Sequence, residues 1–475
     1  MSPTFRSLSV RNYRVYATGG LVSNIGTWMQ RVAQDWLVLA LTGSGTALGI
    51  TTGLQLLPAL LFSPVAGVVA DRFPKRRVLM VTQIAMAVPA AVLGVLAITG
   101  VAEAWHVYVL AFLFGVGTAF DAPARQSFVV EMVGRDDLAN AVGLNSASFN
   151  SGRMIGPAVA GVMIAALGSG VVATGWVILL NAVSYAAVFL SLAALRVHDL
   201  RPATPSPRGR GAVRAGVGYV RSRPDLVLIL TTVFFVGTFG MNFQMTSALM
   251  ATEVFDKGAT EYGILGSIMA IGSLAGALVA ARRELPTRRL VVGAALSFVV
   301  VEIAAGLMPT YLAFAVILPL LGLSALTMVT AANAYIQLTV TPQMRGRVAA
   351  LYLMVFMGGT PFGAPVIGWI GDTFGARWTL ILGGLVAAVG ILSATAFYLL
   401  RAGMHLQVDL RQRPRIRVVP RDPRAAAAAD RRADAAGALD QTDRLDAGES
   451  APEPSESSRP VERPLEQRSR ARSDA

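Results

Sequence analysis

Four residues near the start of the chain have types and spacing that could do chemistry on an apolar helix. They follow one another at helical intervals and share one face: Asn24, Trp28, Arg31 and Asp35. Arg31 and Asp35 are one turn apart and can pair directly. The proton affinity of such a carboxyl depends on its burial and on nearby positive charge. Asp35 is therefore a candidate for taking up and releasing a proton, and a permanent structural ion pair is the alternative.

Two more charged residues lie within apolar stretches. Arg153 lies in the fifth stretch, where it could hold two parts of the molecule together or meet an anionic substrate. Glu302 lies near the end of the ninth stretch and is a second candidate for proton transfer. The alternative for Glu302 is a carboxylate that reaches the outer water. Because charge is costly in an apolar medium, each of these residues marks a functional candidate.

These residues belong to a repeat of about 20 apolar residues and a short polar break, which runs from Tyr16 to Arg401. A bilayer core requires about 20 apolar helical residues to cross it. The repeat predicts an all-α membrane protein with twelve transmembrane helices, in which the polar face with Asp35 lines a central cavity. The expected helices are 16–41, 47–69, 78–100, 105–120, 139–167, 171–195, 225–250, 262–281, 290–308, 311–332, 348–370 and 377–400.

Basic residues are distributed unevenly among the polar breaks. One alternating set of breaks carries many Arg and Lys residues, whereas the other set carries only Lys257 and Arg377. Short loops rich in Lys and Arg stay in the cytoplasm. Both termini are therefore predicted to be cytoplasmic.

The sequence divides into five segments. The break at 197–224 is rich in Pro, Arg and Gly and separates two sets of six apolar stretches. The tail begins with a basic segment that anionic lipid would attract. It continues without apolar periodicity, so residues 425–475 are predicted to be disordered. The expected segments are a cytoplasmic N-terminus (1–15), a six-helix bundle (16–196), a cytoplasmic linker (197–224), a second six-helix bundle (225–401) and a cytoplasmic tail (402–475).

Composition argues against several classes of function. The net charge of +13 comes from short loops that form no continuous patch, so no nucleic-acid partner is expected. The chain has no cysteine and its three histidines are far apart in sequence, so no metal site is expected. It has no Walker motif and no nucleophile elbow, so we expect no enzyme activity and no cofactor.

A basic motif follows the second apolar stretch. Its order of Gly, three residues, Asp, Arg and a basic run resembles the loop signature of the major facilitator superfamily, with Pro74 in place of the usual Gly. The resemblance implies that Asp71 helps to lock a cytoplasmic gate, whereas a generic basic loop is the alternative. The gate motif residues are Gly67, Asp71, Arg72, Lys75, Arg76 and Arg77.

A second motif, rich in glycine, lies in the fifth stretch. Small residues let helices approach closely, and proline bends a helix. The motif is similar to that of the exporter (antiporter) branches of the same superfamily, with Ala160 in place of one glycine. The resemblance implies packing against the eighth stretch at Gly272 and Gly276, and a generic packing helix is the alternative. The antiporter motif residues are Gly143, Gly152, Gly156, Pro157 and Gly161.

Two further positions bear on this resemblance. Many proton-coupled members carry an Arg in the fourth span, four residues before a Gly; here that place, ahead of Gly115, is Ala111. In the seventh stretch, Asn242 is a cavity candidate among Phe and Met residues that would suit hydrophobic cargo. Lipid-facing bulk and helix packing are the alternative for these neighbours.

Together with segments 120–128, 141–150 and 342–348, the motifs resemble the enterobactin-exporter-like branch of the superfamily. The resemblance implies a secondary active transporter of the bacterial plasma membrane. It would export a small amphipathic or hydrophobic molecule (a drug, siderophore or metabolite) by alternating access and proton antiport, as a monomer among membrane lipids. A small-solute importer and a non-transporting membrane interaction protein are the alternatives.

Overall fold

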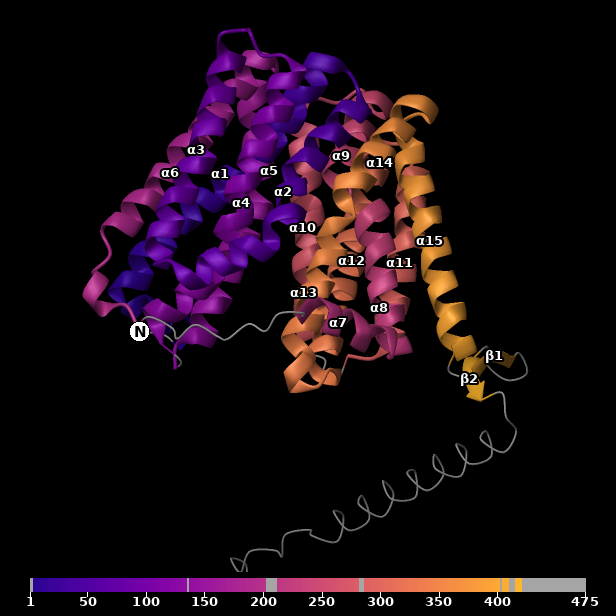
Figure 1. Ribbon diagram of the computed structural model, residues 1–475. Helices are drawn as coiled ribbons and strands as arrows, with labels where there is room; N and C mark the ends of the chain where they lie inside the picture. The colour runs from indigo at the N-terminus through magenta and orange to yellow at the C-terminus, as the bar shows by residue number, and fades with distance from the viewer. Residues whose placement is uncertain are drawn as a thin grey trace, which may run out of the picture. The chain divides into compact units, whose positions relative to one another are not determined.

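The computed structural model describes residues 3–134, 136–201, 212–281, 286–401, 404–409 and 415–420. The chain forms two units, Met1–Tyr398 and Leu399–Ala475. In the described part of the larger unit every regular element is a helix (Figure 1), which agrees with the predicted all-α fold class.

The first half of the larger unit contains six long helices after a 3-10 helix at Pro3–Ser9. At the start of α2 the Ser44 side chain accepts a hydrogen bond from the Ala47 amide. At the start of α4, Glu103 and His106 form a reciprocal capping box. The helices are α1 (Arg11–Thr42), α2 (Gly45–Arg72), α3 (Lys75–Ile98), α4 (Ala104–Val133), α5 (Leu138–Ala166) and α6 (Val171–Ala193).

The second half contains four continuous long helices and two interrupted ones. Two π-helical turns, Val236–Gly240 and Met250–Val254, interrupt the predicted seventh span. The predicted eleventh span is divided at Gly359, between α13 and α14. The helices are α7 (Ala212–Arg221), α8 (Pro224–Phe235), α9 (Phe243–Leu249), α10 (Ala259–Ala281), α11 (Arg288–Gly306), α12 (Tyr311–Thr339), α13 (Pro342–Gly358), α14 (Thr360–Phe374) and α15 (Ala376–Arg401).

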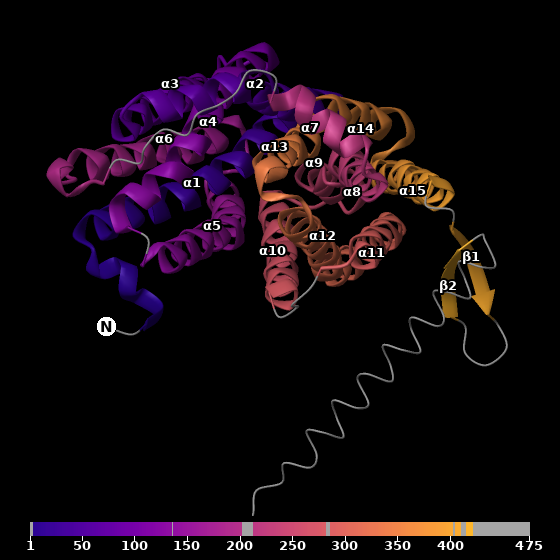
Figure 2. The ribbon, with the colours of Figure 1, turned by 60° about the horizontal axis from the view of Figure 1, so that its bottom comes forward.

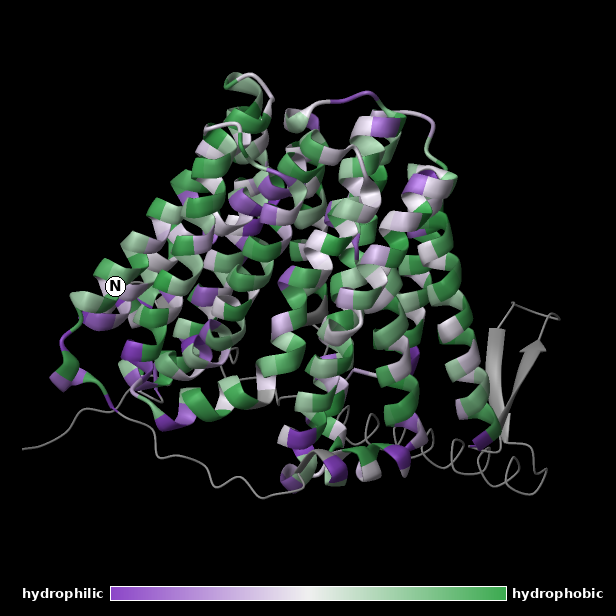
Figure 3. Ribbon diagram, turned by 45° about the horizontal axis from the view of Figure 1, so that its top comes forward, coloured by the Kyte–Doolittle hydropathy of each residue, from purple (hydrophilic) through white to green (hydrophobic). Residues whose placement is uncertain are grey.

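Ten stretches of the described chain are long and apolar enough to cross a membrane. The two remaining predicted spans are α1 and α5, which are helices of 32 and 29 residues. They are less apolar because they carry polar side chains such as Gln30, Gln34 and Arg153. Hydrophobic residues dominate the middle of the helices and hydrophilic ones gather toward the ends (Figure 3), as lipid requires of a multi-pass membrane protein.

The halves of the larger unit meet most extensively through two helix pairs, α2 with α14 and α5 with α10 (Figure 2), and α2 also contacts α13. The first pair depends on glycine. A Cβ atom added at Gly53 would lie 2.7 Å from the carbonyl oxygen of Pro361, and one at Gly45 would lie 3.0 Å from that of Gly368. Because these distances are shorter than van der Waals contact, the two backbones approach this closely only without side chains.

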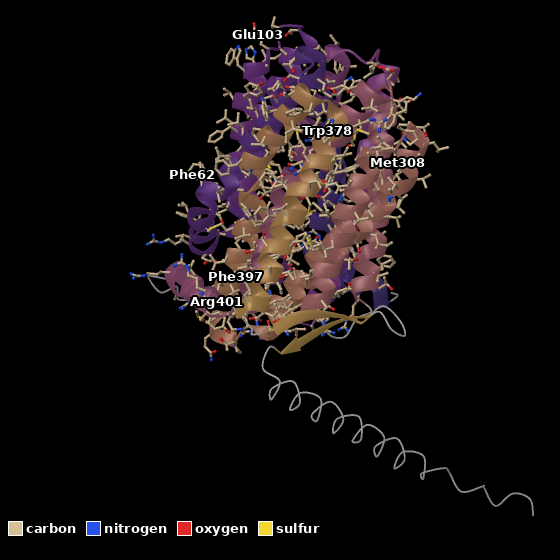
Figure 4. The ribbon with its side chains drawn as sticks, turned by 90° about the vertical axis from the view of Figure 1, so that its right-hand side faces the viewer. Phe62, Glu103, Met308, Trp378, Phe397 and Arg401 are labelled. Carbon is tan, nitrogen blue, oxygen red and sulfur yellow. The ribbon has the colours of Figure 1, made fainter. Side chains whose placement is uncertain are left out.

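The long helices of the larger unit run between two opposite ends. α1 and α5 terminate at the end opposite the labelled N-terminus in Figure 1, and α2 and α10 begin there; we name it the distal end. Figure 4 shows Glu103, which precedes α4, at this end and Phe397, near the end of α15, at the other.

The smaller unit contains a two-stranded antiparallel hairpin of β1 (Met404–Asp409) and β2 (Arg415–Pro420), with Met404 opposite Pro420. No strand is predicted here from the sequence. Alternating Arg and β-branched residues in β2 explain the strand locally. The predicted disorder of 425–475 lies outside the described residues, as do residues 202–211 of the predicted linker. The described parts of that linker include a short 3-10 helix (Val197–Asp199) and α7.

Candidate functional site

The polar face of α1 meets the other half of the molecule at Asp35. The Tyr262 hydroxyl of α10 donates a hydrogen bond of 2.8 Å to Asp35 Oδ2. Asp35 is 7% exposed and Tyr262 is 2% exposed. No ion pair joins Asp35 to Arg31 in the part of the chain that the structure describes, so their possible direct pairing is not formed here, although the two charges interact electrostatically. The hydrogen-bonding partner of the Asp35 carboxylate is instead Tyr262, which reaches it from the other half of the molecule.

Arg31 instead stacks on an aromatic ring together with Arg153. The Arg31 guanidinium carbon lies 4.8 Å from the ring centroid of Trp28, and that of Arg153 of α5 lies 5.8 Å from the same centroid. Both distances are within the range of cation–π attraction. The described contacts of Arg153 are therefore with the first half of the molecule, and they do not support a role in holding the halves together.

Polar and aromatic residues of α5 surround this ring. Asn24 donates a hydrogen bond of 2.9 Å to the Ser148 hydroxyl, and Phe149 packs edge-on against Trp28 with centroids 5.6 Å apart. The opposite face of α1 packs on α6, where Asn181 donates to Gln30. The polar face of α1 therefore contacts α5 at Asn24 and Trp28 and reaches the second half at Asp35.

Glu302 lies in the interior of the second half. It is 1% exposed, so the alternative of a carboxylate that reaches outer water is wrong. A Cβ atom added at Gly240, in the first π-helical turn, would lie 3.0 Å from Glu302 Oε2. One added at Gly384 of α15 would lie 3.4 Å from the same oxygen. This oxygen has no hydrogen-bond partner among the described residues.

Asn242 has a structural role that its sequence position did not suggest. It follows the first π-helical turn, and its Nδ2 donates to the carbonyl oxygens of Thr238 and Phe239 at 2.8 and 3.3 Å. The side chain thus satisfies carbonyl groups near the interruption of the helix. Asn242 is 5% exposed.

The antiporter motif packs on two helices. Gly152 and Gly156 lie against the α1 backbone, where added Cβ atoms would meet Asn24 and Ile25 atoms at 2.9 Å. Gly161 lies against the start of α10, and the Thr260 hydroxyl donates to its carbonyl oxygen. An added Cβ atom at Gly143 meets nothing within 4 Å.

The partners of this motif on α10 differ from those expected. Gly263 and Gly266 lie against Pro157, whereas Gly272 and Gly276 lie against α12. The expectation for Gly272 and Gly276 was therefore wrong. They lie farther along α10, on a side of that helix that faces α12 within the second half.

The gate motif contributes contacts within the first half. Lys75 forms a buried ion pair of 2.6 Å with Glu131 of α4. Arg76 donates to the carbonyl oxygens of Leu192 and Ala193, which end α6. Gly67 and Asp71 are half-buried, and Arg72 and Arg77 are exposed. These contacts fix the start of α3 against α4 and α6.

Two polar arrangements were not predicted as sites from the sequence. Asp121 of α4 accepts hydrogen bonds from Thr82, Gln83 and Arg125 within 2.8 Å, and its spacing from Arg125 was the available signal. Asp372 of α14 accepts hydrogen bonds from the Ser44 hydroxyl and from the amides of Gly45 and Thr46 at 2.5 to 2.9 Å.

Comparison with known proteins identifies the relatives of this chain. The model of the family described as transmembrane secretion effector matches residues 2–420. The multidrug efflux pump Tap of Mycolicibacterium fortuitum is 28% identical, over 83% of this chain and 96% of the relative. The staphyloferrin A transporter of Staphylococcus aureus is 25% identical, over 81% and 95%. Macrolide efflux protein A of Streptococcus pyogenes is 23% identical, over 82% and 96%.

Solved structures share the fold. A bacterial homologue of the human lysosomal transporter Spinster, inward-facing and unoccupied, aligns with a TM-score of 0.62 and 16% identity, over 84% of this chain and 97% of that one. The nucleoside transporter NupG aligns with a TM-score of 0.64 and 12% identity, over 82% and 99%.

Proposed function

Because the chain belongs to the transmembrane secretion effector family of the major facilitator superfamily, we propose that it exports a small amphipathic or hydrophobic molecule by proton antiport. The family and its relatives are transporters and not enzymes. The names of the relatives, two drug-efflux proteins and a siderophore transporter, support export of a drug, siderophore or metabolite.

The proposal includes twelve membrane crossings with cytoplasmic termini in the bacterial plasma membrane. In this proposal α1 and α5 are added to the ten apolar spans, which gives twelve. At 1.5 Å per residue, helices of 32 and 29 residues exceed the roughly 30 Å of a bilayer core. Their polar residues are tolerated because they face protein. The transporter is proposed to act as a monomer that contacts membrane lipids and requires no cofactor, metal or nucleic acid.

The observation that carries the proposal is the buried hydrogen bond between Tyr262 and Asp35, because it joins the two halves through a group that can carry a proton. Opening the distal end would separate these residues and expose Asp35 to water on that side. Arg31, one turn away on the same face, would then be the nearest cation able to stabilise the carboxylate. Proton exchange at Asp35 would thus be coupled to the movement of the halves.

Alternating access is supported by where the halves meet. The contacts of Asp35, Asp372 and Gly161 with the opposite half all lie toward the distal end. We propose that this is the outer end and that the chain is closed there. The gate motif, with Asp71, would then close the opposite, cytoplasmic end in the alternate state.

Glu302 is the second proton-carrying candidate. A buried carboxylate without a partner is costly, and protonation removes that cost. Its position beside the π-helical turn between α8 and α9 would link its protonation to the shape of that helix. Glu302 is proposed as subordinate to Asp35 because its described surroundings lie within one half of the molecule.

A strain that lacks the gene, complemented with wild type or Asp35→Asn, tests the proposal. Drug susceptibility and exported metabolites are compared at equal expression. Wild type should restore export of at least one compound, and Asp35→Asn should reduce its rate at least about tenfold, since one charged hydrogen-bonding group is removed. Asp256→Asn is the matched control, because Asp256 is exposed. Full export by Asp35→Asn would contradict the role of Asp35.

Inside-out vesicles distinguish the alternatives. An exporter accumulates the compound in vesicles whose lumen is acidic, whereas an importer does not. A non-transporting interaction protein would keep its function with both Asp35→Asn and Asp71→Asn. Loss of flux in Asp71→Asn at unchanged expression would exclude that class.

A further inference from the structure

Two guanidinium groups at the polar face, Arg31 of α1 and Arg153 of α5, form no ion pair within the described part of the chain. Neither Arg31 nor Arg153 makes an ion pair or hydrogen bond within the described ranges. Both are half-buried and share the ring of Trp28. Asp35 lies one turn away and interacts electrostatically with Arg31, but no ion pair joins them within the described residues, and Asp35 accepts its hydrogen bond from Tyr262. Two guanidinium groups beside one carboxylate leave an excess positive charge in an apolar body, which is costly.

Other arginines of the same half show how this chain usually treats such charges. Arg125 forms an ion pair of 2.7 Å with Asp121, and Arg76 donates to the carbonyl groups that end α6. Arg31 and Arg153 are exceptions because their contact is an aromatic face rather than an acceptor. Their hydrogen-bond donors are therefore left for a group that the chain itself does not supply.

The surroundings define what that group is attached to. Trp28 and Phe149 offer aromatic surface, and Phe149 is 49% exposed. The Asn24–Ser148 pair lies on the same side of α1 and offers hydrogen-bonding groups. Guanidinium groups bind carboxylates through paired N–H donors, and aromatic side chains bind flat apolar rings.

We propose that Arg31 and Arg153 bind the carboxylate of an amphipathic aromatic anion whose ring packs against Trp28 and Phe149. The inference rests on the proposed function for its biological meaning, because the anion is then the exported substrate. Anion binding removes the mutual repulsion of the guanidinium groups and leaves Asp35 free to exchange its proton.

Three probes that differ in charge test this assignment. 2-Naphthoate, 2-naphthylmethylammonium and 2-naphthalenemethanol share one ring system and are anionic, cationic and neutral. Their binding to the purified full-length protein in lipid nanodiscs is measured by calorimetry. We expect saturable binding of 2-naphthoate that is at least about tenfold tighter than that of either analogue, because only the anion pairs with both arginines.

Variants locate the binding. Arg153→Gln should weaken 2-naphthoate binding at least about tenfold, and Arg153→Lys should retain part of it. Arg289→Gln is the control, because Arg289 is exposed at the start of α11. Trp28→Leu should weaken both 2-naphthoate and 2-naphthalenemethanol, and it replaces Arg153→Gln as the test if that variant does not fold. Folding is checked by size-exclusion profile and helical circular dichroism.

Several results would overturn the inference. They are equal affinities for the three probes, a preference for the ammonium compound, absence of saturable 2-naphthoate binding, or unchanged binding in folded Arg153→Gln. Proteoliposome flux separates this inference from the proposed function. Selective 2-naphthoate binding without proton-driven flux would support the anion site and contradict the proposed transport function. Flux without selectivity for the anion would support transport and contradict the anion site.

Discussion

The carboxyl group of Asp35 contacts both halves of the molecule, since it belongs to α1 and accepts its hydrogen bond from α10. A hydrogen bond to a charged group contributes about 1.5–3 kcal/mol, more than a neutral one. At a buried interface between moving parts, that amount is enough to shift a conformational equilibrium about tenfold. The proton state of one side chain can therefore determine which end of the transporter is open.

Replacing Tyr262 by Phe should weaken closure of the distal end. The variant removes only the hydroxyl, so we expect the distal-open population to rise about tenfold. Spin labels on cysteines introduced at Val101 and Leu307, both exposed, report the separation by pulsed electron resonance, and the chain has no native cysteine to interfere. Tyr311→Phe is the matched control, because its hydroxyl bonds to Glu261 within the same half. Identical distance distributions in both variants would contradict this role.

Single residues were partly predictable from sequence. Helical spacing correctly grouped Asn24, Trp28, Arg31 and Asp35 on one face, because periodicity is a local property. The partner of Asp35 was not predictable, because Tyr262 lies 227 residues away in sequence. The roles of these residues in transport stay predictions until they are measured.

At the scale of helices, the α2–α14 contact forms the clearest connection between the halves. Glycines let the two backbones touch, and the Asp372 carboxylate accepts hydrogen bonds from the first residues of α2. An acidic group at a helix start is favourable because unpaired amides and the helix dipole attract negative charge. We name this arrangement of α2, α14 and Asp372 the distal seal.

Asp372→Asn should loosen the distal seal, because it removes the charge and one of the two acceptor oxygens. The readout is labelling of Trp28→Cys by an impermeant maleimide added outside intact cells, since that position lies on the polar face of α1, which reaches the second half at Asp35. Labelling should be several times faster in Asp372→Asn than in the parent, and Asp256→Asn should match the parent. Equal rates in all three proteins would argue that the seal does not control access from this side.

Helices were more predictable than their interruptions. Apolar runs about 20 residues long located the helices, because the bilayer imposes that length. The division at Gly359 had a sequence signal in the Gly and Pro residues around it. The π-helical turn at Val236–Gly240 had a weaker one, because it depends on packing against Glu302 and Phe298 on α11.

At the scale of the whole molecule, the two halves are joined by few polar contacts relative to those within each half. Asp35, Gly161 and Asp372 connect the halves toward the distal end, whereas Lys75, Arg76 and Asp121 hold the helices of the first half together. Such a division suits halves that move as bodies about a central site. It also explains why the sequence could indicate two bundles but not the conformational state that the structure shows.

Proton exchange during transport tests the central claim most directly. The compound found in the export screen is added to inside-out vesicles with an acidic lumen, and a pH-sensitive dye reports the lumen. With the wild-type protein, the lumen pH should rise as the compound enters. With Asp35→Asn at comparable expression, the compound should not enter and the lumen pH should not rise. Entry of the compound without proton release, or full exchange by Asp35→Asn, would contradict the account.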